Sequence, residues 1–133
     1  MPQIIRSLSL RRVLLLDTIA TGATALLLLM GAEQLASLLG LPIAMLRESG
    51  LILAAFVVFV GWMAAQEPAP ISAVRLVIAA NVIWVAASLM LLVSGFVEPT
   101  AAGYVLISAQ ALVVGGFAEL QMMALRRSRV ATA

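Results

Sequence analysis

Long runs of apolar residues alternate with short polar stretches along this sequence. Four runs stand out, at about residues 13–31, 43–65, 71–94 and 101–125. Each contains about 19–25 residues, and a helix needs about 20 apolar residues to cross about 30 Å of hydrocarbon. In hydrocarbon every backbone N–H and C=O group must find a partner within the protein, and four spans are too few to close a β-barrel. The pattern therefore predicts an all-α integral membrane four-helix bundle, formed by residues 1–133 as a single domain.

The connections between these runs carry turn and capping signals. Residues 32–39 follow the first run and place their leucines on one face, which predicts a short helix lying in the membrane interface. Pro42 follows that segment and is suited to open the second span. Residues 66–70 and 95–99 contain Pro or Gly and predict short turns, so that successive spans run antiparallel. Thr100 is placed to cap the start of the fourth span.

Composition supports a membrane protein and excludes several kinds of site. Hydrophobic residues make up 64% of the chain and charged residues 11%, with a mean hydropathy of +1.16. Soluble domains are about half apolar and about a quarter charged. The sequence contains no Cys, His or Lys. The usual ligands of catalytic zinc, haem and iron–sulfur clusters are thereby missing, as is the lysine needed for a Schiff base. We therefore expect no metal site and no cofactor.

The arginines are concentrated at the two ends of the chain. Six of the eight flank the first and fourth runs: Arg6, Arg11, Arg12, Arg126, Arg127 and Arg129. Cytoplasmic flanks of membrane spans are enriched in Arg and Lys, so both termini are predicted to lie in the cytoplasm. No aromatic residues accompany these arginines for stacking on bases, which argues against nucleic acid as a partner. On the opposite side, Arg47, Glu33 and Glu48 are expected to form a solvated cluster.

Three charged residues lie within the spans instead of at their ends. Asp17, Arg75 and Glu119 each lie about 7–10 Å along their helix, at about 1.5 Å per residue, on the side that carries the termini. A charge within a span usually faces the bundle interior and pairs there, since an unpaired one costs about 3 kcal/mol or more. We therefore expect a buried cluster of two carboxylates and one guanidinium. Three interpretations are open: an ion-pair cluster that fixes the helix packing, a ligand or proton site, or charged groups that are hydrated at the membrane interface. The long side chain of Arg75 favours the third for that residue if it extends to the interface.

Polar residues in the third and fourth spans form a second group of candidates. Asn81, Trp84 and Ser88 lie on one face of the third span, where Asn81 is expected to hydrogen-bond to a neighbouring helix or to line a pocket. Gln110 lies mid-membrane, on the face of the fourth span opposite Glu119. An amide that faces lipid is unfavourable. Gln110 is therefore expected to contact a second copy of the chain, a partner subunit or a polar headgroup held in a groove.

Three segments give the chain a resemblance to a known group of proteins. They are the basic start that runs into residues 14–17, the helix break at 38–42, and residues 118–121 ahead of Arg126 and Arg127. In this layout the chain resembles small bacterial four-span membrane proteins, broadly of DoxX-like type, over most of its length. The resemblance implies a bundle in the bacterial cytoplasmic (inner) membrane that acts as an accessory to another membrane system.

The functional interpretation follows from what the spans carry and what they lack. No residues form a nucleophile with its base, a phosphate loop or a metal-ligand set, so no catalytic residue is assigned and an enzyme is not expected. The favoured interpretation is an accessory or scaffold protein, or one that binds a lipid or lipophilic molecule. Its expected partners are membrane lipids and a second copy of the chain or another membrane protein. The alternative is a small proton- or cation-coupled transporter that works as an oligomer, with Asp17 and Glu119 as the titrating pair.

Overall fold

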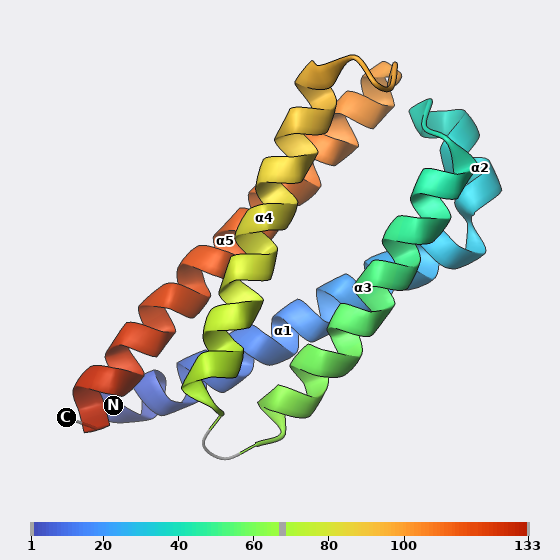
Figure 1. Ribbon diagram of the computed structural model, residues 1–133. Coiled ribbons are helices and arrows are strands. Elements are labelled where there is room, and N and C mark those ends of the chain that lie inside the picture. Colours follow the sequence, from blue (N-terminus) through green and yellow to red (C-terminus); the bar gives the residue numbers. More distant parts are fainter. Residues whose placement is uncertain (1, 67–68, 133) are drawn as a thin grey trace.

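The computed structural model of the chain is an all-α bundle (Figure 1). It describes residues 2–66 and 69–132, with side chains described for residues 10–66 and 69–127. In chain order the helices are α1 (Pro2–Met30), α2 (Ala32–Leu39), α3 (Ile43–Ala64), α4 (Ile71–Ser94) and α5 (Ala101–Thr132). No strand occurs within the described ranges. The predicted fold class is therefore confirmed.

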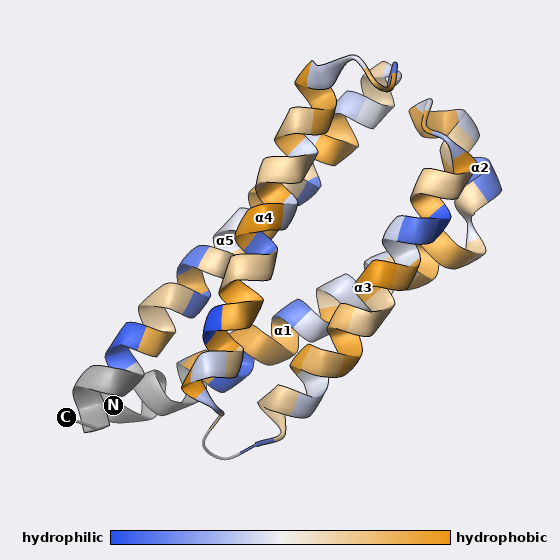
Figure 2. Ribbon diagram, viewed as in Figure 1, coloured by the Kyte–Doolittle hydropathy of each residue, from blue (hydrophilic) through white to orange (hydrophobic). Residues whose placement is uncertain are grey.

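Four of the helices are long and apolar enough to cross a membrane. Their candidate spans contain 21, 22, 24 and 27 residues in α1, α3, α4 and α5. Large apolar side chains point outward along all four, among them Ile19, Val58, Val93 and Leu112, which are 67–85% exposed. Figure 2 shows hydrophobic residues prevailing along these helices. A water-soluble monomer rarely exposes contiguous apolar surface on this scale, so the helices indicate a multi-pass membrane protein.

Most helix ends agree with the predicted turns, but two helices run beyond the predicted spans. α2, α3 and α4 match the predicted segments to within one residue. α1 begins at Pro2 and α5 ends at Thr132, so both helices continue into the arginine-rich flanks. Arginine is a good helix former, and the end of an apolar run is not by itself a helix stop. Hydropathy therefore locates the spans but not the outer ends of these two helices.

The long helices form two pairs. α1 packs against α3 and α4 against α5, and these pairs make most of the contacts between helices. The pairs meet chiefly through α1 and α5, whereas α3 and α4 barely touch although they follow one another in the chain. Figure 1 shows α3 and α4 apart along most of their length. The bundle is consequently less tightly joined on the α3–α4 side than on the α1–α5 side.

Two clusters of buried apolar residues hold the pairs together. The first draws on all four long helices near the end that carries the termini, with Leu14, Val60, Met63, Ala64, Val74, Val77, Ile78 and Leu125. The second joins α2 and the chain after it to α3 and α5 near the other end, with Ala32, Leu39, Leu41, Leu46 and Ile107. Packing of this kind is the main attraction between helices in lipid. The middle of the bundle lies between the two clusters and is lined in part by polar side chains.

A hydrogen-bonded junction joins α2 to α5 at the end opposite the termini. The N–H of Thr100 donates to the Leu39 carbonyl (2.9 Å), and Thr100 Oγ1 donates to the Leu38 carbonyl (2.7 Å). The same Oγ1 accepts the N–H of Gly103 (3.1 Å), so Thr100 caps α5 as predicted. Gly40 ends α2 in the left-handed conformation at φ 70°, which glycine adopts without strain. A Cβ on Gly103 would collide with the Leu39 carbonyl oxygen, so the close approach of the two helices depends on this glycine.

Candidate functional site

Asp17 of α1 is the centre of a buried hydrogen-bond network. Its Oδ2 accepts hydrogen bonds from Gln121 Nε2 of α5 (2.7 Å) and from Asn81 Nδ2 of α4 (3.0 Å). Asn81 Nδ2 also donates to Gln121 Oε1 (3.0 Å), which closes a ring of side chains from three helices. Thr21 Oγ1 donates to Asp17 Oδ1 (2.9 Å). Asp17, Asn81 and Gln121 are 1%, 5% and 0% exposed, so the ring is buried inside the bundle.

The ring fixes how three helices are rotated against one another. Every fully buried side-chain nitrogen or oxygen atom in the described ranges has a hydrogen-bond partner. Side-chain hydrogen bonds between membrane helices contribute about 0.6–2 kcal/mol each. A buried polar group that loses its partner costs about 1–3 kcal/mol. Rotating α1, α4 or α5 would break several of these bonds at once, so the ring selects one arrangement.

Arg75 and Glu119 do not belong to this cluster, and the sequence-based prediction that they do is wrong. Both side chains are exposed, and in the part of the chain that the structure describes neither makes an ion pair with Asp17. Glu119 precedes Gln121 by two residues, which separates them by about 160° around the helix axis. Arg75 precedes Asn81 by six residues, a separation of about 120°. Turning the two amides inward therefore turns the two charged groups outward.

Gln121 is the site residue that the sequence reasoning missed. It borders a buried stripe of α5 formed by Ile107, Ala111, Ala118 and Leu125, which lie within about 40° of one another around the helix. At about 100° per residue, Gln121 lies within about 80° of all four. The prediction instead took the charged Glu119 as the inward-facing residue of this span. A stripe that combines apolar and small residues with one amide would have pointed to Gln121.

A second hydrogen-bond network joins α4 to α5 in the middle of the bundle. Trp84 Nε1 donates to Gln110 Oε1 (2.9 Å), and Gln110 Nε2 donates to Ser88 Oγ (2.9 Å) and to the Ile107 carbonyl (3.0 Å). Ser88 Oγ donates in turn to the Trp84 carbonyl (2.8 Å). The residues predicted to share one face of the third span thus belong to two networks: Asn81 to the first, and Trp84 and Ser88 to the second. Gln110 finds its polar partners within the chain, at Trp84 and Ser88 of α4 and at the Ile107 carbonyl of α5, which removes the reason for expecting a second copy or a partner subunit at this position.

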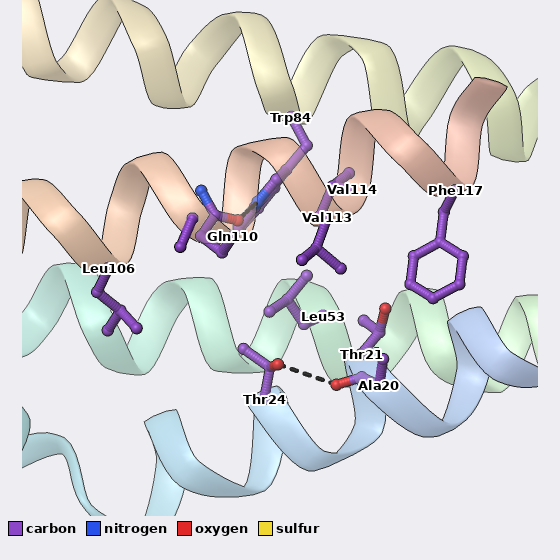
Figure 3. Close-up of a pocket in the computed structure, with 11 residues that line it drawn as sticks. Ala20, Thr21, Thr24, Leu53, Trp84, Leu106, Gln110, Val113, Val114 and Phe117 are labelled. Carbon is purple, nitrogen blue, oxygen red and sulfur yellow. Dashed lines mark hydrogen bonds between the residues drawn. The ribbon is translucent and has the colours of Figure 1, made fainter.

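Three adjoining cavities lie between the helix pairs and share Leu53 and Trp84 as lining residues. Their volumes are about 290, 300 and 250 Å³, and we refer to them together as the chamber. Most of the lining is apolar. The polar lining consists of Thr21, Thr24, Ser49, Asn81, Trp84, Ser88 and Gln110. Figure 3 shows Val113 and Phe117 of α5 pointing toward α1, where Thr21 and Thr24 lie.

The chamber opens sideways between helices on two faces of the bundle. Between α1 and α5 its rim includes Leu106 and Val113, which are 46% and 55% exposed. Between α3 and α4 its rim includes Ile52 and Ile83, which are 59% and 67% exposed. These residues belong to the candidate membrane spans. A molecule dissolved in the hydrocarbon of a bilayer would therefore reach the chamber without leaving the membrane.

The two threonines of the chamber have used their hydrogen-bond donors within the protein. Thr24 Oγ1 donates to the Ala20 carbonyl (2.9 Å), as Figure 3 shows. Thr21 Oγ1 donates to the Asp17 carboxylate. Carbonyl and carboxylate oxygens only accept, so the direction of both bonds is fixed by chemistry. Each threonine oxygen retains lone pairs that can accept a hydrogen bond from a molecule in the chamber.

The side-chain amides of Asn81 and Gln110 likewise donate their N–H groups to partners within the protein. Asn81 Nδ2 donates to Asp17 and to Gln121, and Gln110 Nε2 donates to Ser88 and to a carbonyl. An indole N–H can only donate, so the bond from Trp84 identifies the Gln110 atom that faces it as oxygen. The amide oxygens of Asn81 and Gln110 keep capacity to accept. The polar lining therefore offers mainly acceptors, set in an apolar wall.

Comparison of the chain with known proteins finds nothing similar. No family model matches the sequence, and no curated protein and no solved structure matches it. The resemblance to DoxX-like proteins therefore stays an expectation, and the case for a function rests on this chain's own residues.

The charged residues at the end opposite the termini form a solvated cluster, as predicted. Arg47 Nη2 lies 3.7 Å from Glu33 Oε1, with the two side chains 55% and 75% exposed, and Glu48 is exposed beside them. An exposed pair of this kind contributes at most about 1 kcal/mol. Among the described residues, no group of three or more His, Cys, Asp or Glu side chains could hold a metal ion.

Proposed function

We propose that this multi-pass membrane protein binds a lipid-soluble molecule through a hydroxyl or amino group in the chamber. The observation that carries the proposal is the hydrogen-bonding state of the lining. Apart from the Ser49 hydroxyl, the donors of the lining are committed to partners within the protein, and the lining offers acceptors. A ligand group that donates a hydrogen bond gains a partner there. A group that can only accept finds one uncommitted donor there, the Ser49 hydroxyl, and elsewhere in the chamber is left without a partner, which costs about 1–3 kcal/mol.

The size and openings of the chamber favour a slender ligand that arrives through the membrane. Ligand pockets usually measure about 300–1,000 Å³. Each of the three cavities, at about 250–300 Å³, lies at or just below the lower limit of that range, and they adjoin at Leu53 and Trp84. A single alkyl chain or a small ring system fits this space better than a two-chain phospholipid. The sideways openings support entry from the bilayer.

The proposed setting is the cytoplasmic (inner) membrane of a bacterium, with both termini in the cytoplasm. The concentration of arginines at the two ends of the chain supports this orientation. An accessory role beside another membrane protein agrees with the site, because the chamber offers a ligand hydrogen bonds and apolar contacts but no reactive group.

The two tryptophans provide a direct test of binding. Trp84 lines the chamber, whereas Trp62 is 55% exposed and lies outside it, so the variant Trp62→Phe keeps one reporter in the chamber. This variant, in lipid nanodiscs, is titrated with 1-dodecanol and with dodecyl methyl ether while Trp84 fluorescence is recorded. The alcohol should bind about fivefold more tightly, as expected for one net hydrogen bond of about 1 kcal/mol. Equal affinities, or no saturable change with either compound, would contradict the proposal.

A second variant tests whether the preference comes from the chamber lining. Gln110→Leu removes one acceptor of the chamber and frees the Trp84 N–H as a donor, so it should reduce the preference for the alcohol over the ether. Leu112→Ala is the matched control, because Leu112 is on the same helix, 78% exposed, and outside the chamber lining. That control should bind both compounds as the parent does.

A second candidate function is a small proton- or cation-coupled transporter. Thr21 and Asn81 line the chamber and hydrogen-bond to Asp17, so the carboxylate lies directly behind the chamber wall. The titrating pair expected from the sequence is not formed, because Glu119 is exposed on another face of α5. Flux into proteoliposomes that Asp17→Asn abolishes, while Trp84 fluorescence still reports ligand binding, would favour this candidate over binding alone.

A further inference from the structure

A cavity with two arginines lies between α4 and α5 at the end that carries the termini. Its volume is about 250 Å³, and it is lined by Arg75 and Ile78 of α4 and by Met122, Leu125 and Arg126 of α5. It shares no lining residue with the chamber. The cavity is therefore a separate feature, and its chemistry is different.

The two guanidinium groups have no counter-charge within the described part of the chain. Arg75 and Arg126 are exposed, and neither makes a hydrogen bond or an ion pair there. The carboxylate of Asp17 is enclosed by its own three donors, and that of Glu119 makes no ion pair among the described residues. An arginine is always charged and presents five N–H donors. Two like charges on the wall of one cavity repel each other unless an anion lies between them.

We infer that this cavity binds the phosphate of an anionic phospholipid in the membrane leaflet next to the termini. Guanidinium groups bind phosphate oxygens through paired hydrogen bonds, and two of them from neighbouring helices clamp one phosphate. The remaining lining, Ile78, Met122 and Leu125, is apolar and suits the first methylene groups of an acyl chain. Both arginines lie near the ends of candidate membrane spans, Arg75 in Ile71–Ser94 and Arg126 in Ala101–Arg127, so we expect them at the level where headgroups meet hydrocarbon. Basic pockets between membrane helices at this level are suited to acidic headgroups.

This inference is independent of the ligand proposed for the chamber. The chamber takes a donor-bearing, uncharged or amino lipophile through acceptors, whereas the arginine cavity takes an anion through donors. The full-length protein can hold both ligands at once, because the two sites share no residue. Failure of one proposal therefore leaves the other standing, and the two are tested with different probes and different variants.

The test is lipid retention by the delipidated full-length protein in detergent, measured by native mass spectrometry. The probes are phosphatidylglycerol, phosphatidylcholine with the same acyl chains, and inorganic phosphate. The parent should bind one phosphatidylglycerol at least about fivefold more tightly than phosphatidylcholine. Arg75→Gln and Arg126→Gln should each weaken that binding by about fivefold. Both residues are exposed, so these variants should keep the parent's thermal unfolding midpoint, which is recorded alongside.

Arg127→Gln is the matched control, because Arg127 is adjacent and exposed and its removal changes the charge equally, yet it does not line the cavity. It should bind phosphatidylglycerol within about twofold of the parent. An equal loss in this control would overturn the inference, since it would show general attraction of lipid to a basic surface. Equal retention of the two phospholipids would also overturn it. Displacement of phosphatidylglycerol by millimolar inorganic phosphate would overturn the assignment to a lipid and show a site for free phosphate.

Discussion

Gln121 and Asp17 are 104 positions apart in the chain, yet Gln121 Nε2 donates a 2.7 Å hydrogen bond to Asp17 Oδ2. The bond joins the last helix to the first, and Asn81 adds a helix of the second pair to the same carboxylate. Because apolar surface does not distinguish the interior of a bundle from lipid, these polar contacts specify which faces of the helices meet.

Removal of the Gln121 amide should destabilise the bundle. Gln121→Leu takes a donor from Asp17 and an acceptor from Asn81, and we expect it to lower the free energy of unfolding by about 1–3 kcal/mol. Thermal unfolding in detergent, followed by circular dichroism, measures the effect. Glu119→Gln is the control, two positions away and exposed, and should unfold like the parent. A large loss in the control with none in Gln121→Leu would restore Glu119 to the buried cluster.

Because the polar contacts of Gln110 lie within one chain, removing its amide should change the surroundings of Trp84 and leave the oligomeric state unchanged. In Gln110→Leu the indole N–H of Trp84 loses its acceptor, so in the Trp62→Phe background the emission of Trp84 should shift to shorter wavelength. The mass of the detergent-solubilised protein should stay the same. A fall in oligomer mass, measured by light scattering, would show instead that Gln110 contacts a second copy of the chain.

The junction between α2 and α5 predicts opposite effects for two glycine substitutions on one helix. Gly103→Ala places a methyl group against the Leu39 carbonyl and should cost about 1–3 kcal/mol of stability by overpacking. Gly116→Ala meets no atom within 4 Å and should be neutral or stabilise α5 by up to about 1 kcal/mol. Thermal unfolding of the two variants tests the junction. Equal midpoints would mean that α5 moves freely at that end.

The proposed orientation predicts which positions an impermeant thiol reagent can reach in intact cells. The chain has no cysteine, so single cysteines can be introduced without background labelling. Cysteines at Ser7 and Ser128 should be protected from a reagent added outside, whereas one at Glu98 should react. The reverse pattern would place the termini outside and move the arginine cavity to the outer leaflet.

Much of the fold could be predicted from the sequence, because the bilayer sets the length of each span. Residues 71–94 were predicted as a span and form α4, and the capping role of Thr100 follows from its position after a proline. The extension of α1 to Pro2 could not be predicted in this way, since hydropathy reports where a helix enters lipid and not where it begins.

The rotation of each helix was harder to predict than its depth. Arg75 and Glu119 lie in spans that are apolar on nearly every side, so no polar face marks the outside of the bundle. Two residues that are two positions apart on one helix point in nearly opposite directions, so only one of them can face the interior of the bundle. Glu119 and Gln121 are such a pair, and the sequence alone does not favour the amide over the charge. The choice depends on neighbouring helices, because Asn81 and Asp17 supply complementary partners for an amide.

The division of the buried ring between the two helix pairs has a consequence for how the protein is made. Asp17 and Thr21 belong to α1, whereas Asn81 and Gln121 belong to α4 and α5, which are synthesised after it. Until α4 and α5 enter the membrane, the Asp17 carboxylate has one of its three side-chain donors. Before α4 and α5 are inserted, the Asp17 carboxylate in α1 therefore lacks two of its hydrogen-bond donors, and insertion of α5 supplies the last of them. Assembly of the buried ring is thus complete only when α5 binds α1.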